Sequence, residues 1–374
     1  MPAKRRKIVS MQEVTQPRAA TLEDGSKNSS HEDASNENRG LLCLPYELWG
    51  EIFSSLNGID TFTQAPRHWS YLDYPVLPVL YLEKTDVLRI LCQVSVAYRR
   101  NFLPFLWYSL SACCAARPGP DVKPMMFFRH VAETLVSKCE GLSRNPELAA
   151  LVRCVQLALT RYQSASVIPT LASTLARLPN AHTLHILHAH TQMTTALKDG
   201  FQGISLPQIR TVIVPGYCHE ILRCCPGTKT VWCTEEDGSK LVTVIGSHCK
   251  EVVELRGVLF DDTKAKRIVK AVPNLEVIEI MPYEAEVFLT HLTAFKNFRC
   301  LILKDVRSFN QDEDKGKIQL HHWEHTLRSC AAALKKLPPF KDGRKRSLRI
   351  AHTRSIAGKG GPRPVEYTEV DLAG

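Results

Sequence analysis

Long apolar runs are missing from this chain of 374 residues. A helix that crosses a membrane needs about 20 consecutive apolar residues, and no run in the sequence approaches that length. The first twenty residues, MPAKRRKIVSMQEVTQPRAA, also lack the apolar stretch that a secretory signal carries. We therefore expect a soluble, intracellular protein with no membrane partner.

Paired cysteine motifs are missing as well, although the sequence contains 13 cysteines. No two of them have the C-x-x-C spacing that zinc sites and redox motifs use. Two pairs are adjacent, Cys113 with Cys114 and Cys224 with Cys225. In a reducing compartment such cysteines act as small buried hydrophobic side chains rather than as disulfides.

Motifs that carry catalysis are also absent. The segment HTLHILHAH (182–190) has four histidines, but no cysteine or carboxylate follows at metal-site spacing. His321 and His325 have the spacing of zinc proteases, yet His322 stands where those enzymes have glutamate. GKGG at Gly358 lacks the Ser/Thr and the preceding strand of a phosphate-binding loop. We expect no enzyme, no metal and no cofactor; an α/β enzyme with an unrecognised site is one alternative.

Positive charge is concentrated in two segments. Of the net charge of +10, residues 335–363 carry ten Lys/Arg against one Asp, and KRRK at 4–7 adds four positive charges. The remainder is slightly acidic, which argues against a globular DNA- or RNA-binding domain. We expect no nucleic-acid partner beyond weak contacts of these tails. The clusters at 4–7 and 344–346 predict a location in the nucleus, the cytoplasm or both.

The first folded segments are expected to be helical. LLCLPYELWGEIFSSL (41–56) has Pro45 in a first turn, where its missing N–H costs nothing, and apolar residues recur every four positions from Leu48. A second run, VLRILCQVSVAYRRNFLPFLWYSL (87–110), follows good N-cap residues and reads as one helix that Pro104 closes. Short apolar helices of this kind also fit a small bundle.

From about residue 151 the pattern changes to short strands of the form apolar-x-x-apolar-x-apolar, separated by helical stretches. The central apolar residues recur every 19–29 positions, close to the period of leucine-rich repeats. These central residues are Val155, Leu184, Val212, Val231, Ile278 and Leu301, with Val253 in a weaker copy. The spacing favours a stacked α/β solenoid, in which neighbouring units share a core. A doubly wound parallel sheet is the competing interpretation.

The two helical segments together resemble the F-box, and the whole layout resembles the fungal F-box proteins with irregular repeats. The family pattern is Leu-Pro-x-Glu-Leu, an Ile-Phe pair, an Asp-Leu step, and a helix with Val, an aromatic residue and Arg. The matching residues in this sequence are Leu44, Pro45, Glu47, Leu48, Ile52, Phe53, Asp86, Leu88, Val94, Tyr98 and Arg99. A long insert between the first two helices departs from the family.

The resemblance implies an α+β protein with four parts. These are a disordered tail (1–39), an F-box-like helical module (40–115) with an insert (57–84), an irregular α/β leucine-rich-repeat solenoid (120–337) and a basic disordered tail (338–374).

The resemblance further implies a non-catalytic adaptor subunit of an SCF-type ubiquitin ligase. Its F-box would bind a Skp-family adaptor, which bridges to a cullin, and its repeats would hold a protein target. Alternatives are an F-box scaffold without ligase activity and a nuclear interaction factor with basic tails. Residues expected to bind the Skp adaptor are Leu44, Pro45, Leu48, Ile52, Leu88, Leu91, Val94 and Tyr98. Residues expected to bind the target are His185, Trp232, Glu254, Arg256, Glu279 and Lys304.

Overall fold

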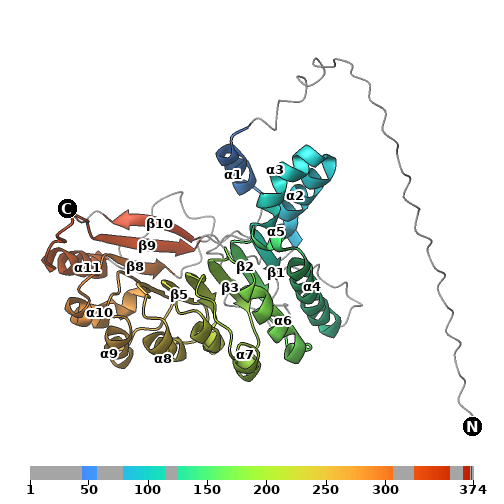
Figure 1. Ribbon diagram of the computed structural model, residues 1–374. Helices are drawn as coiled ribbons and strands as arrows, with labels where there is room; N and C mark the ends of the chain where they lie inside the picture. Colours follow the sequence, from blue (N-terminus) through green and yellow to red (C-terminus); the bar gives the residue numbers. More distant parts are fainter. Residues whose placement is uncertain are drawn as a thin grey trace, which may run out of the picture. The chain divides into compact units, whose positions relative to one another are not determined.

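Figure 1 shows the computed structural model of the chain. The structure describes residues 44–56, 79–113, 124–305, 324–353, 365–370 and 372. The expected N-terminal tail (1–39) and most of the expected insert (57–84) lie outside these residues, so both stay predictions. The described part is a mixed α/β structure, as expected. Within it, no helix is long and apolar enough to cross a bilayer.

A group of short helices precedes the sheet. It comprises α1 (Tyr46–Ser54), the 3-10 helix η1 (Val79–Leu82), α2 (Glu83–Val94) and α3 (Val96–Trp107). The prediction of one helix over 87–110 is wrong, because Ser95 is extended, with φ −160° and ψ 169°. The Ser95 hydroxyl accepts the N–H of Tyr98 at 3.2 Å and so caps α3. Pro104 lies inside α3 rather than at its end.

The described strands form one ten-stranded sheet. Their order across the sheet is the same as their order in the sequence. Neighbouring strands are parallel from the first to the ninth, and the tenth is antiparallel to the ninth. The strands are β1 (Ser109–Ala112), β2 (Cys154–Ala158), β3 (Thr183–His188), β4 (Thr211–Val214), β5 (Thr230–Cys233), β6 (Glu254–Arg256), β7 (Val277–Ile280), β8 (Cys300–Asp305), β9 (Ser347–Thr353) and β10 (Val365–Val370). A doubly wound sheet reverses its strand order, so that interpretation is wrong.

One row across this sheet carries the apolar positions that the repeats predict. Six predicted central residues stand in register on adjacent strands and are buried: Val155, Leu184, Val212, Val231, Ile278 and Leu301. The exception is β6, where Leu255 occupies the row and the prediction of Val253 is wrong. The motif on β6 is hard to recognise because its last apolar position is Gly257.

The helices lie on one side of the sheet (Figure 1), where their apolar faces and the inward strand residues share one core. In α9, for example, Ala265 and Ile268 are buried, and Asp261 caps the helix by accepting the N–H of Lys264 at 2.8 Å. The helices are α4 (Pro124–Arg144), α5 (Pro146–Ala149), α6 (Ser164–Ala176), α7 (Thr194–Gly200), α8 (Ser239–His248), α9 (Asp262–Ala271), α10 (Ala285–His291) and α11 (Glu324–Lys336). Short 3-10 helices are η2 (Thr191–Met193), η3 (Gly216–Cys224), η4 (Pro282–Glu284) and η5 (Leu292–Ala294).

The C-terminal segment does not match the expected disordered tail (338–374), because β9 and β10 lie within it. Leu348 and Ile350 alternate along β9 and are buried, extending the apolar rows of β8. Arg346 anchors the start of this strand by donating to the carbonyl oxygens of Phe298 (3.2 Å) and Pro338 (2.8 Å). The basic composition of this segment therefore hides strand β9 from an analysis of the sequence alone.

Candidate functional site

The helical group has a core of its own. The Trp49 ring meets the Phe102 ring edge-on with centroids 4.7 Å apart, and the Phe53 ring meets it at 5.9 Å. Tyr46 stacks on Phe105 at 4.1 Å. Leu88 is fully buried, so its expected contact with the Skp adaptor is corrected to a core position. This core explains how α1 packs against α3.

A second set of apolar side chains in the same helices faces outward. Leu48 and Ile52 on α1 are 48% and 44% exposed, and Val94 at the end of α2 is 61% exposed. All three were expected to bind an adaptor. Ile90 and Val96, which sequence reasoning missed, are also exposed. We call these five residues the exposed apolar set.

The other expected adaptor residues have intermediate positions. Pro45 is exposed directly before α1, and Leu44 is half-buried. Leu91 and Tyr98 are half-buried as well, with the Tyr98 ring 5.6 Å from the Phe102 ring. Leu44, Leu91 and Tyr98 therefore have only part of their surface available to a partner, whereas Pro45 is exposed.

The residues expected to bind a target do not form an open surface. His185, Trp232, Glu279 and Lys304 are buried, which corrects the expectation that they are exposed. The reason is that their face of the sheet is itself packed. The Arg256 guanidinium lies 5.8 Å from the centre of the Trp232 ring, and the Lys304 ammonium lies 6.0 Å from it.

The half-buried target candidates Glu254 and Arg256 pair with each other. Arg256 also donates to the hydroxyl of Tyr367 on β10. Both side chains are therefore engaged within the chain.

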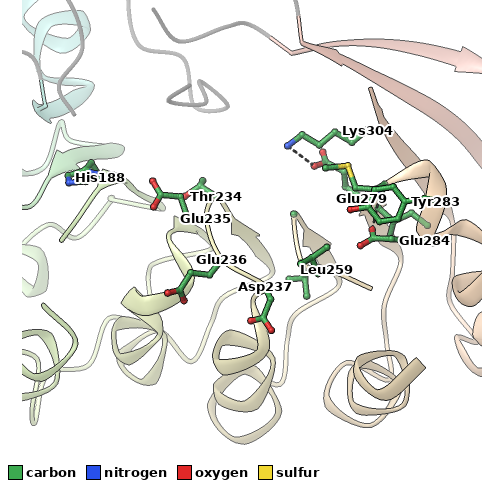
Figure 2. Close-up of a pocket in the computed structure, with 14 residues that line it drawn as sticks. His188, Thr234, Glu235, Glu236, Asp237, Leu259, Glu279, Tyr283, Glu284 and Lys304 are labelled. Carbon is green, nitrogen blue, oxygen red and sulfur yellow. Dashed lines mark hydrogen bonds and ion pairs between the residues drawn. The ribbon is translucent and has the colours of Figure 1, made fainter. Parts of the chain in front are cut away.

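A cavity of about 720 Å³ opens where strands β5 to β8 end. The segments after β5, β6 and β7 form most of its wall, and His188 of β3 and Lys304 of β8 complete it (Figure 2). Because these strands are parallel, the segments that follow them meet at one edge of the sheet. Glu279 and Lys304 are thus brought together with residues that are distant in the sequence.

The cavity wall is strongly acidic. Among the described residues, five carboxylates and one lysine, Lys304, line it. The five are Glu235, Glu236, Asp237, Glu279 and Glu284. His188 adds no positive charge at neutral pH, because burial lowers its pKa to about 4.

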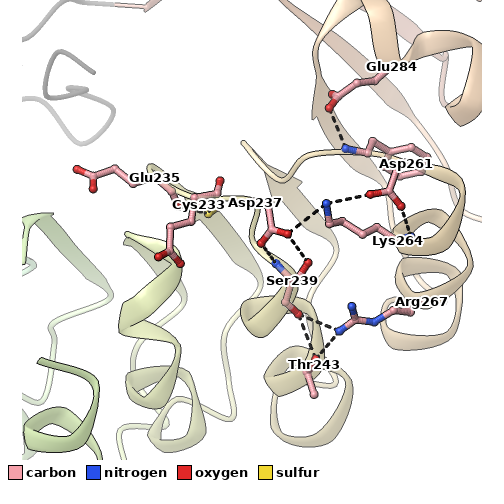
Figure 3. A network of polar contacts seen from close by, with 11 residues as sticks. Cys233, Glu235, Asp237, Ser239, Thr243, Asp261, Lys264, Arg267 and Glu284 are labelled. Carbon is pink, nitrogen blue, oxygen red and sulfur yellow. Dashed lines mark hydrogen bonds and ion pairs between the residues drawn. The ribbon is translucent and has the colours of Figure 1, made fainter. Parts of the chain in front are cut away.

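Two of these carboxylates, Glu284 and Asp237, are bound by neighbouring groups of the same chain (Figure 3). Glu284 accepts the backbone N–H groups of Phe260 at 2.8 Å and Met281 at 2.7 Å. Its pKa is raised, because its burial outweighs these hydrogen bonds. Asp237 accepts both the N–H and the hydroxyl of Ser239, whose hydrogen bonds lower its pKa, and lies 3.3 Å from the Lys264 ammonium.

Two other polar atoms in the wall are less well satisfied. Glu279 is 2% exposed, and its Oε1 has no hydrogen-bond partner among the described residues. The Lys304 Nζ lies 3.6 Å from this oxygen, beyond ordinary hydrogen-bond reach. The buried Oγ1 of Thr234 likewise finds no partner in the described part of the chain. Buried polar atoms usually have partners, so these two single out the cavity.

The shape of the wall depends on backbone conformations with positive φ. Glu236 has φ 65° and Gly238 has φ 71°, so the segment after β5 turns sharply. A Cβ on Gly238 would come within 2.8 Å of Val258, which belongs to the segment after β6. The two segments therefore pack directly against each other.

Across the described residues, no group of three or more His, Cys, Asp or Glu side chains is placed to hold a metal ion. Sequence reasoning had singled out Glu279 and Lys304 but missed the acidic run at 235–237. The signal was three consecutive acidic residues that follow a buried strand after one intervening residue.

A scan against protein-family models found no match to this chain, and a search of curated proteins found no similar sequence.

Proposed function

We propose that this protein is an F-box-type adaptor, in which the helices α1 to α3 bind a Skp-family adaptor and the sheet region holds a protein target. The observation that carries the proposal is the exposed apolar set on helices that pack around a separate aromatic core. Through the Skp adaptor the chain would join a cullin-based ubiquitin ligase. Its contribution would be to position the target, with no bond made or broken by its own residues.

The exposed apolar set lies outside the aromatic core of the helices. Trp49, Phe53 and Phe102 already fill the core between α1 and α3. Leu48 and Ile52 are one turn apart on α1 and remain in contact with water. Exposed apolar side chains that gather on one element are typical of interaction sites.

The start of α1 supports the same interpretation. Pro45 is exposed and stands directly before the helix, next to the half-buried Leu44. The Leu-Pro pair followed by Leu48 and Ile52 is the part of the sequence that most resembles the F-box. The sequence resemblance is therefore strongest at the start of α1, where the proposal places adaptor binding.

The test is a calorimetric titration of the purified chain with a Skp-family adaptor. In the double variant Leu48→Asp/Ile52→Asp, two apolar anchors become charged. Anchors at the centre of an interface contribute about 2 kcal/mol or more each, so affinity should fall at least ~100-fold. Because about half of each side chain is exposed, the melting temperature should fall much less than in a variant of a buried core residue. Replacing Leu44 and Pro45 together by alanine should weaken binding at least ~10-fold.

Two further variants make the result interpretable. Leu259→Ala changes an exposed leucine outside the helical group and should leave adaptor affinity unchanged. Leu88→Ala changes a buried residue and should lower stability as well as binding. Undiminished binding by the Leu48→Asp/Ile52→Asp variant would reject the assignment of this surface.

A further inference from the structure

We propose that the acidic cavity at the ends of β5 to β8 binds a basic side chain, arginine or lysine, of a protein segment. The inference deepens the proposed function, because it names the chemical class of target that an adaptor of this kind would recognise. It depends on that function for its biological meaning. The binding itself can be measured without it.

The cavity carries an excess of negative charge. Among the described lining residues, five carboxylates stand against one ammonium group, that of Lys304. Asp237 has its own cation in Lys264, and Glu284 is held by two backbone N–H groups. Glu236, Glu279 and Glu235, which accepts the Tyr217 hydroxyl, add further negative charge to the wall. A bound cation would offset their mutual repulsion.

A buried carboxylate oxygen also lies in the wall of the cavity. Glu279 Oε1 is buried and makes no hydrogen bond within the described chain. Lys304 balances part of its charge from 3.6 Å away but leaves the lone pairs of this oxygen available. A guanidinium or ammonium group of a ligand would supply the missing donor in a charge-assisted hydrogen bond.

Part of the cavity wall is apolar or aromatic. Tyr283 is 72% exposed and Leu259 is also exposed at this cavity. In Figure 2, Leu259 lies between Glu235 and Glu236 on one side and Glu279 on the other. Arginine and lysine have apolar stems that pack on such side chains while the charged end reaches a carboxylate. An aromatic ring at the rim adds favourable contact with a cation.

The volume of the cavity and the separation of its carboxylates also suit an organic ligand. A cavity of about 720 Å³ is within the range of ~300–1,000 Å³ that organic ligands occupy. The carboxylates surround this space rather than converge on a point, since no three metal-binding side chains come together in the described part of the chain. An extended organic cation therefore suits the site better than a metal ion.

The experiment uses the full chain with its methionine methyl groups labelled with ¹³C. Met281 lines the cavity, so its methyl signal, assigned with Met281→Leu, reports binding at this place. The probes are short glycine–serine peptides with one central arginine or lysine, and a matched peptide with citrulline, which has the shape of arginine without its charge. Spermidine serves as a cation that is not part of a protein.

The expected result is a saturable shift of the Met281 signal with the arginine or lysine peptide and none with the citrulline peptide. Glu235→Gln should raise the dissociation constant at least ~5-fold, because it removes one charge while its amide oxygen still accepts the Tyr217 hydroxyl that now lies 2.9 Å from Glu235. Glu147→Gln removes an exposed carboxylate at the start of α5 and should have no effect. If Glu235→Gln lowers the melting temperature, the exposed Glu236→Gln takes its place.

Several results would overturn the inference. They are equal shifts with the citrulline peptide, no saturation up to on the order of 10 mM peptide, or affinity that ignores both glutamate variants. A shift with spermidine but with neither basic peptide would overturn the assignment to a protein segment. Adaptor titration distinguishes the two proposals: a chain that binds the adaptor but no basic peptide refutes only the role of the cavity.

Discussion

Gly257 approaches the backbone of the preceding strand so closely that a Cβ at this position would lie 2.1 Å from the carbonyl oxygen of Cys233. Its φ of 65° is also a conformation that other residues rarely adopt. The same Cβ would lie 3.1 Å from two ring atoms of Trp232. Strand β6 can therefore pair with β5 and turn into the cavity wall only with glycine at 257.

We expect Gly257→Ala to destabilise the protein by roughly 3 kcal/mol or more, because it combines backbone strain with a clash against rigid backbone. Urea denaturation would measure the change in the free energy of unfolding. Gly203→Ala is the matched control, since Gly203 has φ 75° and open space around its Cα. It should cost only about 1 kcal/mol, the cost of the left-handed conformation. Equal losses in the two variants would contradict the clash.

We expect Phe102→Ala to unfold the helical group while the sheet stays folded. Phe102 is fully buried and touches the rings of Trp49 and Phe53, so its loss should cost about 3–5 kcal/mol. Hydrogen–deuterium exchange should then accelerate in α1 to α3 and stay slow in β2 to β8. Val96→Ala, at a residue that is 80% exposed, should leave all exchange rates unchanged. Acceleration throughout the sheet would mean that the helices and the sheet unfold as one unit.

We expect His185 to make the protein less stable in mild acid. Burial lowers the pKa of His185 to about 3, and its Nδ1 has no hydrogen-bond partner in the described structure. In the unfolded chain the pKa returns to about 6.5, so the unfolded state binds the proton first. The stability that neutral His185 provides is complete above pH 6.5 and is lost as the pH falls from there toward 3.

Between pH 7 and pH 5 this histidine should account for a loss of about 2 kcal/mol, at 1.36 kcal/mol per pH unit below 6.5. The variant His185→Gln should lose that much less stability over the same interval in urea denaturation. His325→Gln, at an exposed position of α11, should keep the loss of the unchanged protein. The idea fails if His185→Gln and the unchanged protein lose the same amount.

The repeat pattern predicted the buried row of the sheet well. Positions such as Val212 and Val231 recur because each strand must bury a residue at the same height. The pattern failed on β6, where the close approach of Gly257 to Cys233 removes the last apolar residue of the motif. Local spacing cannot anticipate a glycine that is required by a neighbouring strand.

The face opposite the helices was harder to predict. Alternation along a strand says which face Trp232 occupies but not what covers that face. In the structure, cations from β6 and β8 lie over its ring. The acidic cavity has the same limitation, since its wall is built from segments that only the parallel register brings together. Composition misled in the C-terminal region, where basic residues obscured the alternation of Leu348 and Ile350.

The order of the strands also bears on how the chain is made. Since each strand pairs with the one before it, a nascent chain can add strands to the sheet in the order of synthesis. The contact between Arg256 and Tyr367 is different, because it joins residues 111 positions apart. It can form only after the chain has been translated past residue 367. The tyrosine on β10 thus distinguishes a finished sheet from one still growing at the ribosome.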